Sequence, residues 1–136
     1  MTVYLLDTNH VSAVLEDKFA LRKRIEQHAA TGRFCIAMPI LGELYFRAYA
    51  SRRPEKNLAQ LARFLDEMPV WDYGPEEARE YGRIQAEQKR RGLPIPPIDA
   101  QIAAVARIHN LVVLTADHHF QYVDGLLTEN WLEGGV

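Results

Sequence analysis

The 136-residue sequence lacks several features that would assign a protein to a class at once. It has a single cysteine, Cys35, which excludes an intrachain disulfide, and the apolar residues around it indicate a buried, inert thiol in a reducing compartment. No apolar run approaches the roughly 20 residues that a transmembrane helix needs. The chain also begins without the pattern of a signal peptide. These absences predict a cytoplasmic protein without a membrane anchor.

An excess of charge of one sign is also missing. Sixteen Lys and Arg residues against eighteen Asp and Glu residues give a formal net charge of -2, and 48% of the residues are hydrophobic. A strongly basic domain would indicate a nucleic-acid partner through its overall charge, so any such binding here must use local patches. The length and composition are those of one globular domain, over residues 1–136.

Cysteine and histidine residues with the spacing of a structural zinc site are absent as well. His118 and His119 are adjacent, so their side chains are expected to point in different directions and to make a poor pair of ligands. Both histidines, and His10, are interpreted as surface residues or as residues that support a site without contacting its ligand.

The sequence does contain alternating strand and helix patterns. Short apolar runs predict strands over 3–6, 33–38 and 111–115, with weaker candidates over 70–73 and 126–128. Apolar residues at spacings of three and four predict helices over 11–16, 19–30, 40–50, 55–67, 75–91 and 99–109. Because parallel strands need crossover connections, this alternation predicts an α/β fold, a three-layer α/β/α sandwich with a central parallel sheet. The proline-rich connection over 92–97 is expected to be extended and stiff.

Four acidic residues fall where predicted strands end or the following helices begin. Asp7 and Asp117 follow strands, Asp99 opens a helix, and Glu43 lies in the first turn of the helix after the second strand. In an open parallel sheet these positions share one edge, which is where ligands bind. Residues distant in the sequence can therefore converge there.

Each acid also has a purely structural interpretation. Asp is a favoured residue for capping a helix, and Asp7, Asp99 and Asp117 could each cap one, contributing about 1 kcal/mol per cap. Glu43 could form an ordinary ion pair with Arg47, one helical turn away. Taken one at a time, the acids do not distinguish these roles from a functional site.

Taken together, the acids predict a cation site. Two carboxylates about 4 Å apart repel by about 4 kcal/mol at an effective dielectric constant near 20, so a cluster of four must take up protons or a cation. Mg²⁺ or Mn²⁺ suits such a set of oxygen ligands. An ion held in this way activates water and stabilises charge on a phosphoryl group, which is the chemistry of phosphodiester hydrolysis.

Four segments carry these acids: Leu-Leu-Asp-Thr-Asn over 5–9, Pro-Ile-Leu-Gly-Glu-Leu over 39–44, Pro-Ile-Asp-Ala-Gln-Ile-Ala-Ala over 97–104 and Val-Leu-Thr-Ala-Asp-His-His-Phe over 113–120. They resemble, in the same order, the four acidic motifs of PIN-domain nucleases. The resemblance covers essentially the whole chain, and the compact form is similar to the VapC toxins of bacterial toxin–antitoxin pairs. It implies a metal-dependent endoribonuclease that arrests growth as a toxin. The catalytic and metal-binding residues so implied are Asp7, Glu43, Asp99 and Asp117, holding Mg²⁺ or Mn²⁺, with Thr8, Asn9 and Thr115 orienting them.

The same resemblance implies partners. They are an RNA substrate, with transfer RNA a common target in the family, and a small antitoxin that lies across the active site and often presents an arginine to the acids. Homodimers that assemble with antitoxin into a DNA-binding complex are implied as well. Basic clusters over 22–24, 52–53 and 89–91 are candidates for contacts with RNA phosphates, although charged runs on helices are commonly plain solvated surface.

Three alternatives remain at this point. A haloacid-dehalogenase-like phosphatase would need a second Asp where Asn9 stands. A Mg²⁺-binding receiver-like signalling module would need a phosphoacceptor Asp after its third strand and a Lys after its fifth, and no convincing Lys is found. A non-catalytic domain that binds RNA or an antitoxin would use the acids as helix caps only.

Overall fold

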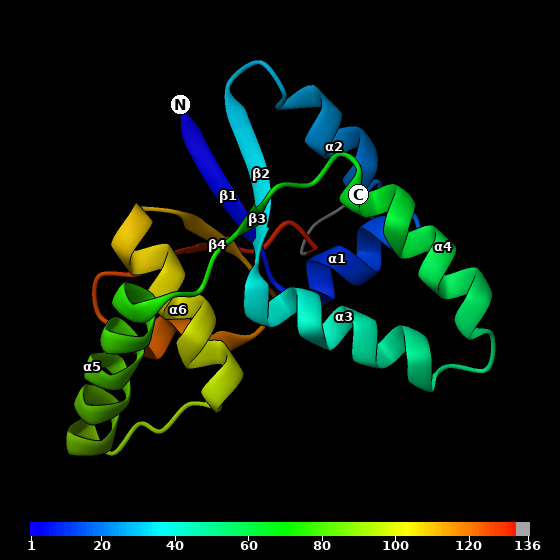
Figure 1. Cartoon of the computed structure of the whole chain (residues 1–136). Helices are drawn as coiled ribbons and strands as arrows, with labels where there is room; N and C mark the ends of the chain where they lie inside the picture. Colours follow the sequence, from blue (N-terminus) through cyan, green and yellow to red (C-terminus); the bar gives the residue numbers. More distant parts are fainter. Residues whose placement is uncertain (133–136) are drawn as a thin grey trace.

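Five parallel strands form the centre of the computed structural model, which describes residues 1–132 (Figure 1). The strand order is β3-β2-β1-β4-β5. Leu5 and Leu6, at the end of the central strand, are fully buried because sheet neighbours and helices surround them on every side. The strands are β1 (Thr2–Leu6), β2 (Gly32–Ala37), β3 (Val70–Trp71), β4 (Val112–Leu114) and β5 (Leu127–Glu129).

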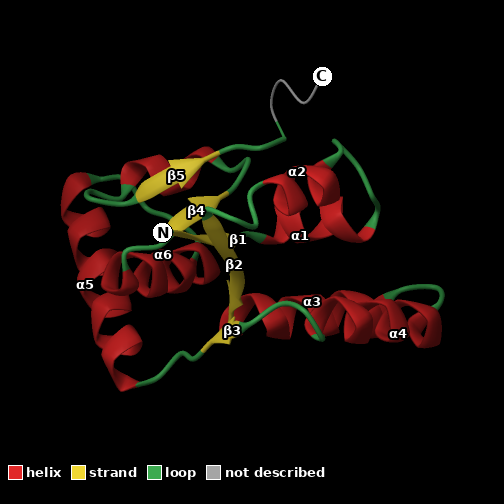
Figure 2. Ribbon diagram, turned by 90° about the horizontal axis from the view of Figure 1, so that it is seen from above, coloured by secondary structure: helices red, strands yellow, loops and turns green. Residues whose placement is uncertain are grey.

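Helices cover both faces of this sheet, with α5 and α6 on one face and α1 to α4 on the other (Figure 2). The predicted three-layer α/β/α sandwich is therefore confirmed. None of the helices in the described part of the chain has the length and hydrophobicity of a membrane span. The helices are α1 (Thr8–Leu15), α2 (Leu21–Gln27), α3 (Met38–Ala50), α4 (Pro54–Leu65), α5 (Pro75–Arg91) and α6 (Pro97–His109), with a short 3₁₀ helix, η1 (His118–Tyr122), after β4.

Helix α6 has a deeply buried face, and small residues make this possible. Ala100, Ala103 and Ala104 are fully buried, together with Ile102 and Val105. Alanine side chains let the helix backbone lie close to the sheet and to α5 in a well-packed interior. The beginning of α6 is thereby held firmly at the edge of the sheet where β1 and β4 end.

Two helix boundaries differ from the sequence prediction in a way that affects the acids. Helix α6 begins at Pro97, so Pro97 is not part of the extended connection, and Asp99 is the third residue of the helix. Proline is well suited to the first helical position, where its missing N–H is not needed. Helix α3 begins at Met38, which places Glu43 in the second turn and not in the first.

Helices α1 and α2 also differ from the prediction. Helix α1 begins at Thr8, three residues early, because Asp7 caps it. Helix α2 is shorter than the predicted 19–30, since Phe19 and Ala20 have φ angles of 60° and 52°. Such left-handed backbone is incompatible with a continuous helix and ends any extension toward α1.

Cys35 lies in β2, and its side chain is buried, as predicted, with 2% of the residue exposed. Burial raises the pKa of its thiol to about 12. A thiol that does not ionise near neutral pH is a poor nucleophile, so the interpretation of an inert side chain is confirmed.

Candidate active site

Asp7 lies where β1 passes into α1. Its Oδ1 accepts a hydrogen bond from the backbone N–H of Thr8 at 2.8 Å, so the side chain caps α1. Its own backbone N–H donates to the carbonyl of Leu114 at 2.9 Å, which joins the end of β1 to the end of β4. The residue is 6% exposed. Asp7 is therefore a carboxylate buried at the meeting point of two strands.

Two polar side chains fix Asp7 relative to the loop after β4. Thr115 Oγ1 donates to Asp7 Oδ2 at 2.7 Å and accepts from the backbone N–H of Asp117 at 2.9 Å. Asn9 Nδ2 donates to Asp7 Oδ2 at 3.3 Å, and Asn9 Oδ1 accepts from the N–H of Ala116 at 3.2 Å. Asp7 and Asp117 are thus held in a defined mutual position, because Thr115 and Asn9 each form hydrogen bonds both to Asp7 and to the backbone of the loop that carries Asp117.

Glu43 reaches the same region from α3. Thr8 Oγ1 donates to Glu43 Oε2 at 3.2 Å. Arg47 Nη2 lies 3.6 Å from Glu43 Oε1, so the ordinary ion pair along the helix is also present. The Arg47 side chain is 54% exposed, and a pair of this kind is weak because water screens it. The pair therefore does not neutralise Glu43 firmly.

Asp99 and Asp117 approach from α6 and from the loop after β4. Asp117 caps η1 by accepting from the backbone N–H of His119 at 2.9 Å, whereas Asp99 caps nothing, because α6 begins before it. Asp99 Oδ2 is buried and has no hydrogen-bond partner among residues 1–132. The capping interpretation is correct for Asp7 and Asp117 and wrong for Asp99.

The charges of these acids act on one another. Burial raises the pKa of Asp99 to about 7, and the negative charges of Asp7 and Asp117 contribute to the rise. Burial also raises the pKa of Asp7, where hydrogen bonds from Thr115 and Thr8 oppose the rise and the charges of Asp117 and Glu43 reinforce it. Burial alone would raise the pKa of Asp117 too, but the backbone hydrogen bond from His119 and the charge of its nearby ring outweigh it and leave that pKa lowered.

The structure thus brings the four predicted acids to one edge of the sheet, where β1 and β4 end and α3 and α6 begin (Figure 1). Over the described range 1–132, Arg47 is the only Lys or Arg that forms an ion pair with any of them. The buried Asp99 Oδ2 without a hydrogen-bond partner, and the rise in the pKa of Asp99 despite the opposing charge of His119, indicate negative charge that the chain compensates only in part. An all-oxygen set of this kind fits a hard divalent cation.

His119 is a member of this site that the sequence interpretation missed. Its Nδ1 lies 2.9 Å from Asp117 Oδ1 and 3.6 Å from Asp99 Oδ2. In residues 1–132, Asp99, Asp117 and His119 form the one group of three whose ligand atoms all lie within 4.8 Å of one another, without Asp7 or Glu43. His118 is exposed, as predicted. The signal in the sequence was a histidine two residues after the acid that follows the strand β4.

His10 is neither a surface residue nor part of the acidic group. It is fully buried, its Nε2 accepts from the backbone N–H of Trp131 at 3.1 Å, and its Nδ1 lies 2.7 Å from Asn9 Oδ1. Burial lowers its pKa to about 4, with help from the charge of Arg24. His10 is a core residue that holds Asn9 in place.

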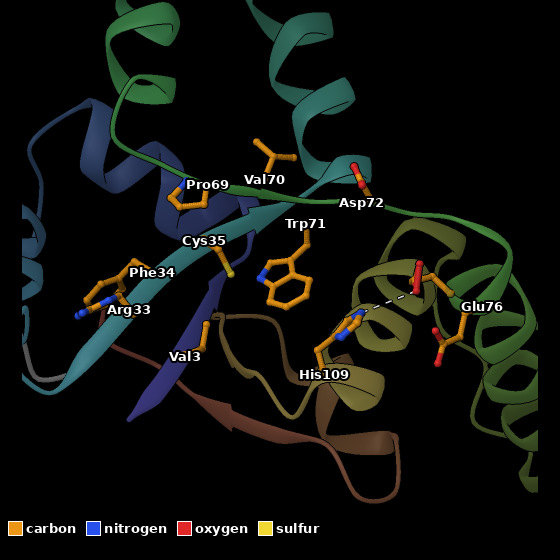
Figure 3. Close-up of a pocket in the computed structure, with 11 residues that line it drawn as sticks. Val3, Arg33, Phe34, Cys35, Pro69, Val70, Trp71, Asp72, Glu76 and His109 are labelled. Carbon is orange, nitrogen blue, oxygen red and sulfur yellow. Dashed lines mark ion pairs between the residues drawn. The ribbon is translucent and has the colours of Figure 1, made fainter.

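A separate hollow of about 680 Å³ lies beside β1, β2 and β3, on the side of α5 and α6 (Figure 3). Trp71 stacks on His109 there, with ring centroids 4.3 Å apart, and His109 Nε2 lies 3.7 Å from Glu77 Oε2. Its lining includes Val3 and Phe34 but none of the four acids. The hollow is therefore distinct from the acidic site.

Known proteins are similar to this chain in sequence and in fold. Residues 4–126 match the PIN domain. The chain belongs to the PIN-domain family. This PIN domain is 36% identical over 134 residues to the ribonuclease VapC2 of Haemophilus influenzae, covering 97% of this chain and 100% of that protein. It is 37% identical over 133 residues to the tRNA(fMet)-specific endonuclease VapC of Shigella flexneri, covering 96% and 99%.

Solved structures of similar fold support the same family assignment. The DNA-bound VapBC structure from Salmonella typhimurium superposes on this PIN domain with a TM-score of 0.88 at 34% identity, covering 96% of this chain and 99% of that chain. VapBC2 from Rickettsia felis, bound to a DNA fragment from its promoter, gives a TM-score of 0.90 at 26% identity, with the same coverage. The resemblance to PIN-domain nucleases of the VapC kind is confirmed, as are the fold and the class of enzyme.

The family assignment removes two of the alternatives. Receiver-like modules have the strand order 2-1-3-4-5, whereas this PIN domain has the order β3-β2-β1-β4-β5. A haloacid-dehalogenase-like phosphatase is inconsistent with a match to the PIN domain over residues 4–126. The third alternative, a domain that binds RNA or an antitoxin without cleaving, is disfavoured because the full-length relatives are named ribonuclease and endonuclease.

Proposed function

We propose that this PIN domain is a divalent-cation-dependent endoribonuclease that acts, as a single cytoplasmic domain, as the growth-arresting toxin of a toxin–antitoxin pair. The observation that carries the proposal is the convergence of Asp7, Asp99 and Asp117, where burial and the charges of Asp7 and Asp117 raise the pKa of Asp99 to about 7. Relatives of full length named ribonuclease VapC and tRNA(fMet)-specific endonuclease support RNA as the substrate, with transfer RNA the first candidate.

Each predicted site residue has a role in this proposal. Mg²⁺ or Mn²⁺, when bound, supplies a Lewis acid for a phosphoryl oxygen and a water molecule of lowered pKa. The residues that would hold the ion are Asp7, Glu43, Asp99 and Asp117. Thr115 and Asn9 hold Asp7 through hydrogen bonds to its Oδ2, and Thr8 orients Glu43 through its hydroxyl. Hydrogen bonds of this kind fix the direction of a carboxylate and preserve metal affinity.

Removal of divalent cations tests this function. Purified protein, freed of any antitoxin, is expected to cut transfer RNA at defined positions with Mg²⁺ or Mn²⁺. EDTA should slow cleavage by at least about 100-fold, since metal activation supplies several kcal/mol of the barrier reduction. Excess Mn²⁺ should restore the rate. Cleavage that is unchanged in EDTA contradicts the proposal, and RNA binding without cleavage in either ion favours the non-catalytic alternative.

The three basic clusters differ in their availability to RNA. Arg24 packs over the ring of Trp131 at 4.4 Å, and Arg22 Nε donates to the carbonyl of Val14, so this cluster is engaged within the fold. The second cluster, over 52–53, follows the end of α3, far along that helix from Glu43. The third cluster, over 89–91, lies at the C-terminal end of α5, on the side of the molecule where α6 begins (Figure 1).

Lys89 and Arg90 in the third cluster are exposed and form no ion pair with any residue from 1 to 132, whereas Arg91 pairs with Asp124 at 3.4 Å. We infer that Lys89 and Arg90 contact phosphates of the bound RNA. Replacement of both by Ser should raise KM about tenfold with little change in kcat. It should also reduce the slope of log K against log salt by about 1 to 2, because each phosphate contact releases counterions.

The matched control replaces Arg52 and Arg53 by Ser, which removes the same charge at the far end of α3. Cleavage rates across a salt series, with full-length transfer RNA, measure both variants. Equal changes in KM for the two double variants would show a general effect of net charge and would contradict a specific role for Lys89 and Arg90.

A small antitoxin is the proposed protein partner, and the VapBC structures similar to this chain support it. A guanidinium presented by such a partner suits the acidic site, because arginine forms charge-assisted hydrogen bonds with carboxylates. A homodimer, and its assembly with antitoxin, stay predictions. Phe46 and Tyr49 of α3 are 70% and 68% exposed, so Phe46 does not belong to the core and is available for such a contact.

A further inference from the structure

His119 stands out because its ring nitrogen lies among the carboxylates of the acidic site. We propose that His119 supplies a nitrogen ligand to the cation held by Asp99 and Asp117, so that the site prefers Mn²⁺ over Mg²⁺ more strongly than an all-oxygen site does. The proposal rests on the proposed metal-dependent function. It adds a ligand of a different chemical kind to the four acids.

The position of the ring is fixed by its own backbone. The N–H of His119 donates to Asp117 Oδ1 at 2.9 Å, which ties the start of η1 to that carboxylate. The ring also packs edge-on to Tyr122, with centroids 5.9 Å apart. Nδ1 consequently faces Asp117 Oδ1 at 2.9 Å and Asp99 Oδ2 at 3.6 Å.

Neither of the two buried atoms that face each other in this group has a hydrogen-bond partner. Both Asp99 Oδ2 and His119 Nδ1 are shielded from solvent and have no hydrogen-bond partner among residues 1–132. His119 Nδ1 lies close to Asp117 Oδ1, but the angles of this contact are not those of a hydrogen bond. Buried polar atoms without partners are uncommon and call for an unseen ligand such as water or an ion. A cation that accepts lone pairs from all three side chains would satisfy them together.

The spacing of the three atoms fits this arrangement. Ligand atoms at right angles around an ion, with bonds of about 2.1 Å, are about 3 Å apart. The two Nδ1 distances, 2.9 Å and 3.6 Å, lie at and slightly above this value. Affinity for sites with nitrogen ligands follows the series of first-row transition metals, which begins with Mn²⁺, whereas Mg²⁺ takes oxygen ligands. A nitrogen at this position therefore changes which ion the site selects.

The neighbouring residue His118 provides a matched control. It has the same ring one position earlier in η1, is exposed, and belongs to no group of possible ligands in residues 1–132. His118→Ala removes an imidazole from the same short helix without touching the acids. Any effect confined to His119→Ala is then due to the position of the ring and not to the loss of a histidine from η1.

The test uses the full chain without a histidine tag, loaded with Mn²⁺, and measures electron spin echo envelope modulation. The wild type and His118→Ala should both show coupling between Mn²⁺ and a ¹⁴N nucleus. When histidine is labelled with ¹⁵N, this signal should be replaced by coupling to ¹⁵N. His119→Ala should show neither nitrogen coupling. Calorimetric titration should show Mn²⁺ binding to His119→Ala weakened by about tenfold or more, with Mg²⁺ affinity within about threefold of the wild type.

The outcomes separate this proposal from the metal-dependent function. Mn²⁺ that binds to the wild type without histidine nitrogen coupling overturns the ligand role of His119 and leaves the four acids as the metal site. Coupling that persists in His119→Ala overturns it as well. Absence of any Mn²⁺ binding contradicts the metal-dependent function itself. If His119→Ala fails to fold, the ¹⁵N-labelled wild type and His118→Ala still decide the question.

Discussion

Asp99→Asn is expected to abolish RNA cleavage while making the metal-free protein more stable. The change keeps the shape of the side chain and removes a negative charge that the other acids oppose. Loss of one carboxylate from a metal site should lower kcat by about 1000-fold or more, which corresponds to about 4 kcal/mol of transition-state stabilisation. A merely structural Asp99 would show no such loss.

The stability effect has a definite sign. The pKa of Asp99 is raised to about 7 by burial and by Asp7 and Asp117, so in the folded protein its ionised form is disfavoured. The cost in stability is complete above pH 7, shrinks as the pH falls from 7 toward the ordinary Asp value of 3.8, and is absent only below that value, where Asp99 is protonated in the unfolded chain as well. In EDTA, Asp99→Asn should therefore raise Tm by roughly 3 °C or more at pH 8, with a smaller difference at pH 5.

Thermal unfolding followed by circular dichroism, in parallel with the cleavage assay, measures both effects. Asp124→Asn is the matched control, because that carboxylate is 79% exposed and lies outside the acidic site. It should change neither activity nor Tm appreciably. Retained cleavage by Asp99→Asn would remove Asp99 from the metal site, and a large drop in Tm at pH 8 would show that its charge has a favourable partner.

The fold and the acidic site could be predicted from sequence for the same physical reason. Alternating strand and helix patterns define a parallel sheet, and a parallel sheet places the ends of its strands at one edge. Asp7 and Asp117 follow strands that pair directly, since Leu6 is in register with Leu114. Their convergence therefore follows from topology alone and needs no knowledge of side-chain packing.

What could not be predicted depends on local backbone geometry. The direction of the His119 ring is set by the 3₁₀ turn of η1, and no periodicity in the sequence reveals that turn. The early start of α6 depends on Pro97 adopting the first helical position instead of extended backbone. For His10 the surface interpretation was wrong and the supporting one was right, and its burial could not be predicted because it depends on a specific partner, the backbone N–H of Trp131, far away in the sequence.

Asp7 has two functions that one substitution can separate. As a helix cap it accepts from the N–H of Thr8, and as a site residue it supplies negative charge. Asn caps helices about as well as Asp, and its amide oxygen can still accept a hydrogen bond. Asp7→Asn should therefore keep the cap on α1 and fold, at the cost of an amide NH₂ where Oδ2 accepts from Thr115 and Asn9, whereas Asp7→Ala also loses the cap, which contributes about 1 kcal/mol.

Expression of the wild-type protein alone is expected to stop bacterial growth, and Asp7→Asn is expected to relieve the arrest. The neutral amide keeps the cap on α1 but supplies a weaker ligand for a divalent ion than a carboxylate, so RNA cleavage should fail while the protein accumulates. Colony counts after induction, with immunoblots that show equal soluble protein, measure the effect, and co-expression of the cognate antitoxin, for which a small neighbouring gene is the first candidate, should rescue the wild type. Normal growth despite abundant soluble wild-type protein would exclude the toxin role. Equal arrest by Asp7→Asn would show that growth stops for a reason unrelated to the acidic site.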